Sequence, residues 1–421
     1  MLPVLNYNDD LSRIFNRSQL DLQAVNSAVK NIIDAVKTNG DKALFKFSKE
    51  FDNFDLDASN IFLSEKEITE AVSKVDNKTL TALKKAKKNI EDYHARQKPK
   101  DDFNSSDKTG FIFKPVDRVG IYVPGGKAAY PSSVLMCAIP AIVAGVKEIF
   151  VVTPPGQYLN QLTIAAAKLC GVNKIFRVGG AQAIAALAYG TASVPKVDVI
   201  VGPGNIYVTV AKKQVFGDVG IDMIAGPSEI LIIADNSANA SFIAADLLSQ
   251  AEHDELAQSV LVTTCRELAD KVSKELATKI KLLQKKEIAK KSLEKYGAIV
   301  VCDTLEKAVI LSNRIAPEHL ELMVADPQSL LKGIKHAGAV FLGSYSPEPL
   351  GDYYAGTNHV LPTSSTARFS SGLGVDTFLK RISVVNYSKN DLLKVADDIA
   401  LLASVEELQA HANSVIIRKN S

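Results

Sequence analysis

Short runs of β-branched residues alternate with alanine-rich segments from Gly110 onward. This alternation predicts βαβ units, in which each parallel strand is followed by a helix that returns the chain to the same edge of the sheet. Strands are predicted in this stretch at 119–123, 148–153, 174–178, 197–201 and 229–234. The helices between them are predicted to begin at Ser132, Asn160, Ala181 and Asn205.

A second stretch repeats the alternation and leads into a helical tail. Its strands are predicted at 258–263, 298–301, 320–324 and 339–342, and its helices at 241–253, 305–315 and 327–336. Before Gly110 the chain is charged, and the apolar spacing at 20–36 and 68–93 is typical of amphipathic helices. The tail carries predicted helices at 390–402 and 405–412, the second of which ends on His411.

These patterns predict an α/β protein with two Rossmann-like parallel-sheet units between a helical N-terminal region and a helical C-terminal arm. With 421 residues the chain is too long for one ordinary core, so a division into units is also expected from length. The predicted boundaries are 1–110 for the N-terminal region, 111–235 and 236–374 for the two units, and 375–421 for the arm.

Turns of small residues follow several predicted strands of the first unit. They are Pro124-Gly125-Gly126, Pro154-Pro155-Gly156, Gly179-Gly180 and Gly202-Pro203-Gly204. In an open parallel sheet such turns lie at the carboxyl edge, where helix N-termini and bare backbone amides favour phosphate. No turn matches G-x-G-x-x-G, and tight βα loops also use glycine for purely structural reasons. On pattern alone, a nucleotide site and structural turns are therefore equally good interpretations.

Composition and charge narrow the kind of ligand. Lys plus Arg (49) nearly balances Asp plus Glu (47), which gives a net charge of +2 and predicts neither nucleic-acid nor membrane binding. A small-molecule ligand is expected instead. The first ten residues lack a basic segment followed by an apolar one, so a cytoplasmic location is expected. The four cysteines stand singly in apolar contexts, which predicts buried thiols rather than disulfides or a thiolate zinc site.

Polar clusters that interrupt the second unit carry the candidate chemistry. Gln250 and His253 are three residues apart on a predicted helix, so both side chains would project from one face toward one ion or ligand. By itself this pair is weak evidence, because glutamine is an unusual zinc ligand and a histidine near a helix C-terminus often just complements the helix dipole.

Two further clusters lie in predicted loops. Glu318 and His319 form a carboxylate–imidazole pair after Pro317, able to activate water and to move a proton, although a surface ion pair is an equally good interpretation. Asp352 and His359 share a glycine-rich loop, where Asp352 would complete a zinc site left open to substrate or simply cap its own turn. His411 is distant in sequence and would reach the site only if the arm folds back or crosses to another subunit.

Together these clusters resemble the histidinol dehydrogenase family, over a stretch from about Leu11 to His411. The most specific stretches are 120–126 (GIYVPGG), 129–136 (AYPSSVLM), 178–184 (VGGAQAI), 202–205 (GPGN), 225–229 (AGPSE), 249–254 (SQAEHD), 316–321 (APEHLE) and 351–359 (GDYYAGTNH). The resemblance implies an aldehyde-dehydrogenase-like architecture. It also implies a zinc-dependent, NAD-linked oxidation of L-histidinol through the aldehyde to L-histidine, the last step of histidine biosynthesis, with two NAD consumed in turn.

The resemblance also assigns roles to residues. The zinc ligands would be Gln250, His253, Asp352 and His411, the last from the partner subunit of a homodimer. Glu318 would activate the water that attacks the aldehyde-level intermediate, and His319 would take the hydroxyl proton. Ser228, His359 and Glu406 would contact the substrate together with His319 and the zinc ligands, and Tyr122, Gln182 and Asn205 would contact NAD.

Two functions from other classes compete with this one. A zinc hydrolase would use Glu318 to activate water and would bind no NAD, which makes the glycine turns merely structural. A regulatory binding module would keep the fold without turnover, and the intact set of candidate ligands and bases argues against it.

Overall fold

The computed structural model describes residues 2–16, 22–125, 130–156 and 159–420. The chain forms two compact units, of which the first comprises Met1–Lys98 and Val116–Phe378 and the second Pro99–Pro115 and Leu379–Ser421. The first unit contains two parallel sheets and the second an antiparallel strand pair with two helices. This grouping differs from the four consecutive segments expected from the sequence, because residues 99–115, which interrupt the first unit, group with the C-terminal residues 379–421.

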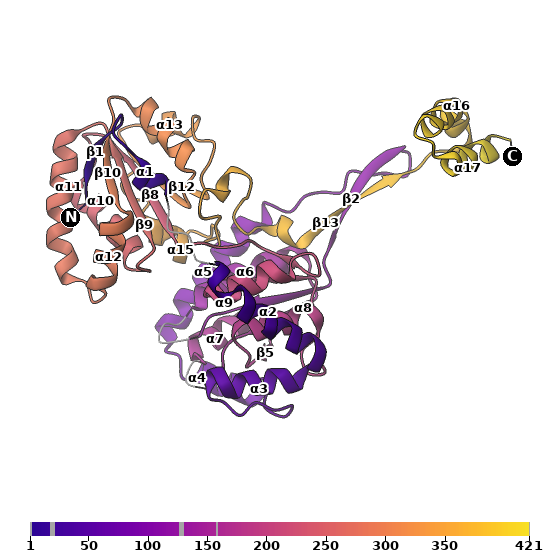
Figure 1. Ribbon diagram of the computed structural model, residues 1–421, viewed down its shortest axis with the longest axis horizontal. Helices are drawn as coiled ribbons and strands as arrows, with labels where there is room; N and C mark the ends of the chain where they lie inside the picture. The colour runs from indigo at the N-terminus through magenta and orange to yellow at the C-terminus, as the bar shows by residue number, and fades with distance from the viewer. Residues whose placement is uncertain (1, 17–21, 126–129, 157–158, 421) are drawn as a thin grey trace. The chain divides into compact units, whose positions relative to one another are not determined.

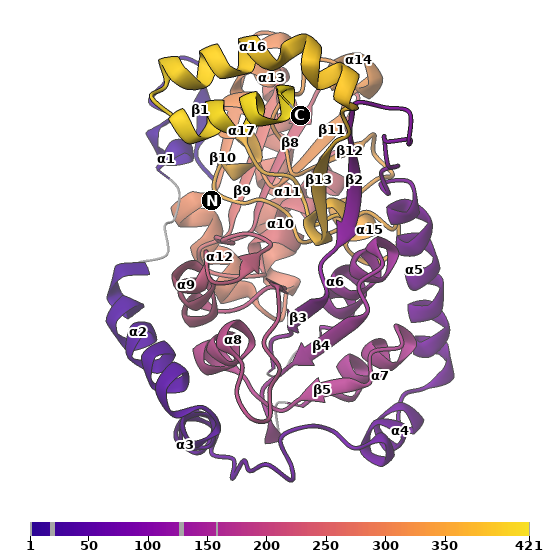
Figure 2. The same cartoon turned by 90° about the vertical axis from the view of Figure 1, so that its right-hand side faces the viewer.

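One sheet of the first unit has five parallel strands in the order β5-β4-β3-β6-β7, of which Figure 1 labels the edge strand β5. They are β3 (Arg118–Tyr122), β4 (Glu148–Val152), β5 (Lys174–Phe176), β6 (Val199–Val201) and β7 (Gly220–Ile221). The associated helices are α2 (Leu22–Asn39), α3 (Asp41–Asp52), α4 (Glu65–Ser73), α5 (Asn77–Ala95), α6 (Pro131–Ala144), α7 (Gln161–Leu169), α8 (Gly180–Tyr189) and α9 (Ile206–Val215). Figure 2 shows β3, β4 and β5 side by side.

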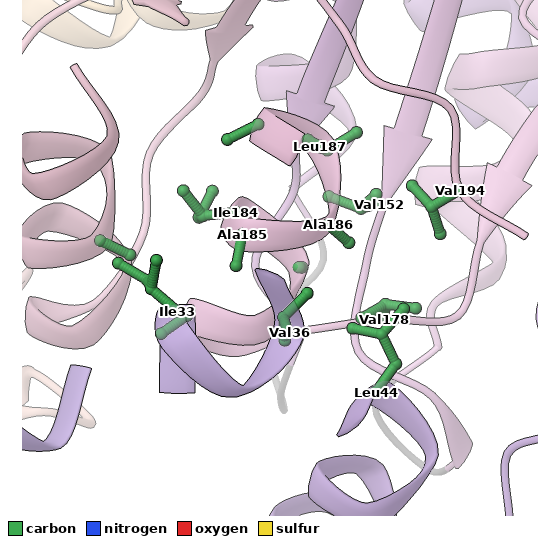
Figure 3. Packing of buried hydrophobic residues seen from close by; sticks show 14 of the residues in the cluster. Ile33, Val36, Leu44, Val152, Val178, Ile184, Ala185, Ala186, Leu187 and Val194 are labelled. Carbon is green, nitrogen blue, oxygen red and sulfur yellow. The ribbon is translucent and has the colours of Figure 1, made fainter. Parts of the chain in front are cut away.

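Helix α8 lies at the centre of the hydrophobic core that packs around the five-stranded sheet. Its residues from Ala181 to Ala188 are all buried, and Ile184 and Leu187 pack among side chains from β4, α2 and α3 (Figure 3). A Cβ atom at Gly120 would lie only 2.7 Å from Leu187, so glycine in β3 allows the helix to approach the sheet closely. The alanine-rich composition of α8 is therefore a requirement of packing.

The other sheet has six parallel strands in the order β1-β10-β9-β8-β11-β12. They are β1 (Val4–Asn6), β8 (Glu229–Ala234), β9 (Gln258–Thr263), β10 (Ala298–Val301), β11 (His319–Met323) and β12 (Ala339–Leu342). Its helices are α1 (Ser12–Phe15), α10 (Ala240–Ala251), α11 (Arg266–Lys279), α12 (Lys286–Tyr296), α13 (Leu305–Ile315), α14 (Pro327–Leu331) and α15 (Glu348–Tyr353). Short 3-10 helices lie at Ile280–Leu282, Thr366–Arg368 and Val375–Phe378, and the last of these packs against α6.

The second unit pairs β2 (Thr109–Pro115) with β13 (Leu379–Val385) and continues into α16 (Lys389–Val405) and α17 (Gln409–Lys419). The expectation of a helix at 405–412 ending on His411 was wrong. Helix α16 runs through to Val405, and His411 lies near the start of α17 instead. The strand pairing was not expected either, because its partners are separated in sequence by residues 116–378 of the first unit.

The predicted parallel sheets are confirmed, and the strands at 229–234, 258–263, 298–301 and 339–342 have the predicted bounds. The N-terminal region is rich in helices, as predicted, but it also contributes the strand β1, which pairs with β10 in the six-stranded sheet. The helix predicted at 327–336 ends at Leu331. Among the described residues, no helix combines the length and apolar character needed to cross a membrane.

Candidate active site

The Glu318–His319 pair lies at the amino end of β11. Helix α13 ends at Ile315; the following Ala316, with a φ of 52°, turns the chain away from the helix axis, and Pro317 prevents the helix from continuing. Glu318 and His319 follow in the entry to the strand and are 6% and 4% exposed. The predicted helix-to-strand junction is confirmed, but the pair is buried, so the alternative of a surface ion pair is wrong.

The tautomer of His319 follows from one contact. Nδ1 lies 3.0 Å from the backbone carbonyl oxygen of Glu229, and a carbonyl only accepts, so Nδ1 carries the proton. Nε2 is then the unprotonated nitrogen, and it is buried with no hydrogen-bond partner. Burial lowers the pKa of His319 to about 4, which keeps the ring neutral near pH 7.

The same backbone holds the neighbouring carboxyl group. Oε2 of Glu318 accepts a hydrogen bond from the Glu229 N–H at 2.9 Å and lies 3.6 Å from Nδ1 of His319. Burial raises the pKa of Glu318 well above its usual range, and nearby carboxylates add to the shift. A carboxylate with a raised pKa is a stronger base than an exposed one, as proton abstraction from water requires.

Gln250 lies near the C-terminal end of α10, a helix capped at its other end by the side chain of Asn239. Its side chain is 0% exposed, yet neither its amide nitrogen nor its amide oxygen has a hydrogen-bond partner. An unsatisfied buried amide is destabilising by about 1–3 kcal/mol, so this side chain is expected to have a ligand. His253 lies two residues beyond the helix end, exposed in the following turn, which corrects the predicted helix at 241–253.

Helix α15 brings two carboxylates to the same place. Glu348 and Asp352 are four residues apart and therefore share one face. Oδ1 of Asp352 lies 3.8 Å from Nε2 of His319, and one potential ligand atom each from His319, Glu348 and Asp352 lie within 4.8 Å of one another. Burial, followed by the charge of Glu348, raises the pKa of Asp352 to about 8.

His359 and Ser228 border this cluster. His359 is partly buried, its Nε2 has no hydrogen-bond partner, and burial lowers its pKa to about 4, an effect to which His319 and His253 also contribute. Ser228 directly precedes β8, and its carbonyl oxygen accepts a hydrogen bond from the Gln258 N–H at 3.0 Å. Ser228 and Glu318 thus precede neighbouring strands at the amino edge of the six-stranded sheet.

The residues expected to contact NAD lie at the carboxyl edge of the five-stranded sheet. Tyr122 ends β3, Gln182 lies in the first turn of α8 after β5, and Asn205 caps α9 after β6. The Tyr122 hydroxyl oxygen accepts a hydrogen bond from the Gly180 N–H at 3.1 Å. No side chain caps the N-terminus of α8, which leaves an amide-rich helix end at this edge. Gly126 of the first glycine turn and Ala129 of the adjoining motif lie outside the described residues.

Two contacts join this nucleotide-type edge to the polar cluster. His359 is hydrogen-bonded to the backbone of Ser132, in the first turn of α6. The adjacent Asn358 donates to the carbonyl oxygen of Met136 in the same helix at 2.7 Å. Helix α6 begins at the carboxyl edge of β3, so the amino edge of one sheet adjoins the carboxyl edge of the other.

His411 and Glu406 belong to the second unit, where Glu406 follows α16 and His411 lies in α17. Both side chains are exposed in this unit. The structure therefore brings together Glu318, His319, Asp352 and His359 in the first unit. It places Gln250 next to Ser249, whose hydroxyl is bonded to Glu348 of the same cluster, and it places the two arm residues in a separate compact unit.

The donor set fits a divalent metal. It offers an amide, imidazoles and carboxylates, which are nitrogen and oxygen ligands of the kind that zinc accepts. Gln250 and Nε2 of His319 have no partners, and a cation here would also favour the charged form of Asp352, whose pKa is raised without one. Nothing in the cluster requires a thiolate.

Three buried carboxyl groups beside the site were not singled out in the sequence. They are Asp246, Glu321 and Glu348. A signal for two of them was present, because Asp246 and Glu321 each interrupt an apolar run, in Ala244–Leu248 and Leu320–Met323. Charged residues are rarely fully buried unless they are paired, so such an interruption indicates a specific role.

The fold and the site together define an α/β oxidoreductase, in which a parallel-sheet edge suited to a nucleotide adjoins a buried cluster of bases and metal-type ligands. The family model of histidinol dehydrogenase matches residues 15–419. The chain belongs to the histidinol dehydrogenase family, whose members are oxidoreductases of histidine biosynthesis.

Individual relatives agree over nearly the full length. The chain is 53% identical to a histidinol dehydrogenase of Clostridium acetobutylicum, covering 93% of this chain and 91% of the relative. It is 51% identical to one of Carboxydothermus hydrogenoformans, with 99% and 98% covered. A crystal structure of histidinol dehydrogenase from Elizabethkingia anophelis, 38% identical, superposes with a TM-score of 0.93 and covers 99% of this chain and 98% of that one.

Proposed function

We propose that this chain oxidises L-histidinol to L-histidine through the aldehyde, with zinc and two molecules of NAD, as a homodimer. The observation that carries the proposal is the buried cluster of His319, Glu348 and Asp352, whose potential ligand atoms lie within 4.8 Å of one another. The unpartnered amide of Gln250 adds to it, because the adjacent Ser249 is hydrogen-bonded to Glu348. Family membership supports the same substrate and reaction. In functional terms, residues 111–235 would bind NAD and 236–374 would hold the metal and the catalytic groups.

Gln250, His253 and Asp352 would hold zinc together with His411 of a second copy. When bound, zinc would fix the substrate through its imidazole and amino nitrogens and so orient the alcohol carbon. NAD, held near Tyr122, Gln182 and Asn205, would accept the hydride in each oxidation. Ser228, His359 and Glu406 would complete the substrate pocket.

His319 would serve the alcohol step. Its protonated Nδ1 is committed to the Glu229 carbonyl, so the lone pair on Nε2 is available to take the substrate hydroxyl proton as hydride leaves the carbon. The Glu229 contact also prevents the ring from flipping, because the other nitrogen would then face a carbonyl oxygen without a proton to donate. The product of this step is the aldehyde.

Glu318 would serve the aldehyde step. Its raised pKa suits a carboxylate that removes a proton from water while the oxygen attacks the aldehyde carbon. The resulting hydrate again loses a proton and a hydride, and this yields the carboxylic acid. Atoms and electrons balance, because each of the two oxidations removes one hydride and one proton and the second also takes up one water.

The dimer proposal rests on the arm. Large apolar side chains on it are exposed, among them Leu401 (63%), Leu402 (66%), Val405 (74%) and Ile417 (66%). Apolar patches on small units mark interaction surfaces, and a second copy would cover this one. A particle of twice the 45.3 kDa chain mass in sedimentation would agree with it, and a monomer at micromolar concentration would contradict it. A cytoplasmic location also stays a prediction.

The experiment that tests the reaction measures NADH absorbance at saturating L-histidinol and NAD, with the full chain before and after chelation and after zinc is returned. We expect two NADH per histidinol, loss of turnover with the chelator, and recovery with zinc but not with magnesium. No NADH from zinc-loaded protein would contradict the proposal and favour the zinc hydrolase, which needs no NAD.

A further inference from the structure

We propose that Asp246, Ser249, Glu321 and Glu348 form a positioning network that fixes the relative positions of Gln250, His319 and Asp352. The inference rests on the proposed function, because these relative positions matter only if the three side chains act on one metal and substrate. The network joins three elements of the six-stranded half, α10, β11 and α15, all labelled in Figure 2. None of its members is among the proposed zinc ligands or catalytic bases, although Glu348 also offers a potential ligand atom at the site.

The first link joins α10 to α15. The Ser249 hydroxyl donates to Oε2 of Glu348 at 2.9 Å, and Glu348 is only 2% exposed. Ser249 is the neighbour of Gln250, and Glu348 lies one helical turn before Asp352. The hydrogen bond therefore fixes the distance between the two backbones that carry Gln250 and Asp352.

The second link joins α15 to β11. The backbone N–H of Glu348 donates to Oε1 of Glu321 at 2.8 Å. This N–H is in the first turn of α15 and has no partner within the helix, so Glu321 supplies the acceptor. Glu321 and His319 are two residues apart in one strand and share a face, while Leu320 and Leu322 point to a separate apolar cluster. The bond therefore sets α15, and with it Asp352, against the face that carries His319.

The third link closes the network back to α10. Asp246 and Glu321 lie close enough for their carboxyl groups to interact, and a proton shared between the two groups would bond them. Oε2 of Glu321 is buried and has no hydrogen-bond partner, so it is free to take part in such a bond. Asp246 lies one turn before Gln250 on α10.

Ser249 is thus adjacent to Gln250, and Glu321 is two residues from His319 in the same strand. Asp246 and Glu348 each lie one helical turn before a site residue, Gln250 and Asp352 respectively. Substituting a group that orients metal-binding side chains typically weakens metal binding about 10–100-fold. Ser249→Ala and Glu321→Leu should both have this effect. Glu321→Gln should not, because the amide oxygen can accept from Glu348 while the amide nitrogen donates to Asp246 in place of the shared proton.

The test measures the zinc dissociation constant of the full chain by competition with a chromogenic chelator, and then kcat and the KM for NAD at saturating zinc. Ser292→Ala is a matched control, because Ser292 is 0% exposed and its hydroxyl donates to a carbonyl, that of Ala257, at 2.8 Å. We expect zinc binding about 10–100-fold weaker in Ser249→Ala and Glu321→Leu and unchanged in Glu321→Gln and Ser292→Ala. In the two weakened variants kcat should fall while the KM for NAD stays constant.

Wild-type zinc affinity in Ser249→Ala and Glu321→Leu would overturn the network and leave the proposed function intact. Equal weakening by Glu321→Gln and Glu321→Leu would also overturn it, because the amide keeps both bonds. If Glu321→Leu does not fold, the contrast between Ser249→Ala and Ser292→Ala decides. A wild-type chain that binds no zinc would overturn the proposed function first.

Discussion

Oε2 of Glu318 accepts a hydrogen bond from the backbone N–H of Glu229 at 2.9 Å. The carbonyl oxygen of Glu229, the first residue of β8, accepts a hydrogen bond from Nδ1 of His319. One peptide backbone therefore orients both candidate catalytic groups. Because β8 and β11 are neighbouring parallel strands, the register of the sheet sets the geometry of the pair.

Replacing Glu318 with Gln should separate the two oxidation steps. The amide oxygen can still accept from Glu229, so the fold should be kept, but the base for water is lost. Oxidation of L-histidinal should slow about 10²–10⁴-fold, as for loss of a general base, while oxidation of L-histidinol to the aldehyde largely survives. Stopped-flow measurement of NADH from each substrate checks this. Equal loss of both steps would contradict the assigned role of Glu318.

Gln250→Leu should have opposite effects with and without metal. In the chelated protein it removes an amide without hydrogen-bond partners, so the free energy of unfolding should rise by about 1–3 kcal/mol. Zinc should then no longer stabilise the variant. The matched control is Gln258→Leu, because the buried Gln258 amide donates to the Ile14 carbonyl at 3.1 Å and its loss should destabilise. Urea unfolding, with chelator and with zinc, measures the free energy of unfolding of each variant in the two states. If zinc stabilised Gln250→Leu as much as wild type, Gln250 would not be a ligand.

Mixed dimers should show whether the arm crosses between subunits. His411→Ala and His253→Ala chains are each expected to be inactive alone. In a hybrid dimer with shared sites, both faults fall in one site and the other site is intact, so activity should return to about half per hybrid. Native mass spectrometry would verify subunit exchange. An exchanged mixture without activity would indicate that His411 acts within its own chain.

The glycine turn after β6 depends on a buried ion pair. Lys212 and Asp222 form an ion pair, and their side chains are 5% and 1% exposed. The Lys212 ammonium also donates to the Gly202 carbonyl oxygen at 3.0 Å, and the Asp222 carboxylate accepts from the Gly202 N–H at 2.8 Å. Lys212→Met leaves Asp222 unpaired and should lower the free energy of unfolding by about 3–5 kcal/mol. The KM for NAD should rise more than the KM for histidinol. The double variant with Asp222→Leu should recover part of the stability, and no recovery would contradict the pairing.

Asp52 should make stability depend on pH. Burial raises the pKa of this carboxyl, at the end of α3, to about 6, and its Oδ2 has no hydrogen-bond partner. The folded state then binds the proton more tightly than the unfolded chain, so this contribution to stability grows as pH falls through about 6 and is complete below the unfolded value of 3.8. Asp52→Asn should therefore be more stable than wild type above pH 6, with little difference near pH 4. Thermal melts across this range test it, and a constant difference would contradict the shift.

The sequence alone determined the α/β class, the parallel strands and the polar clusters, because β-branched runs, helix caps and small-residue turns are local signals. Asn160 and Asn205 cap the predicted helices, and β8, β9, β10 and β12 have the predicted bounds. The motifs also identified the family. What local pattern does not carry is partnership across long separations, such as β1 with β10 or β2 with β13.

Only the tertiary structure decided how the site is assembled. The burial of Glu318, the tautomer of His319 and the unpartnered amide of Gln250 all depend on contacts with segments far away in sequence. Asp246, Glu321 and Glu348 are ordinary acidic residues in the sequence, and they become a network only because α10, β11 and α15 pack together. The physical reason is that pKa values, tautomers and unsatisfied hydrogen bonds are properties of an environment, which exists only after the chain has folded.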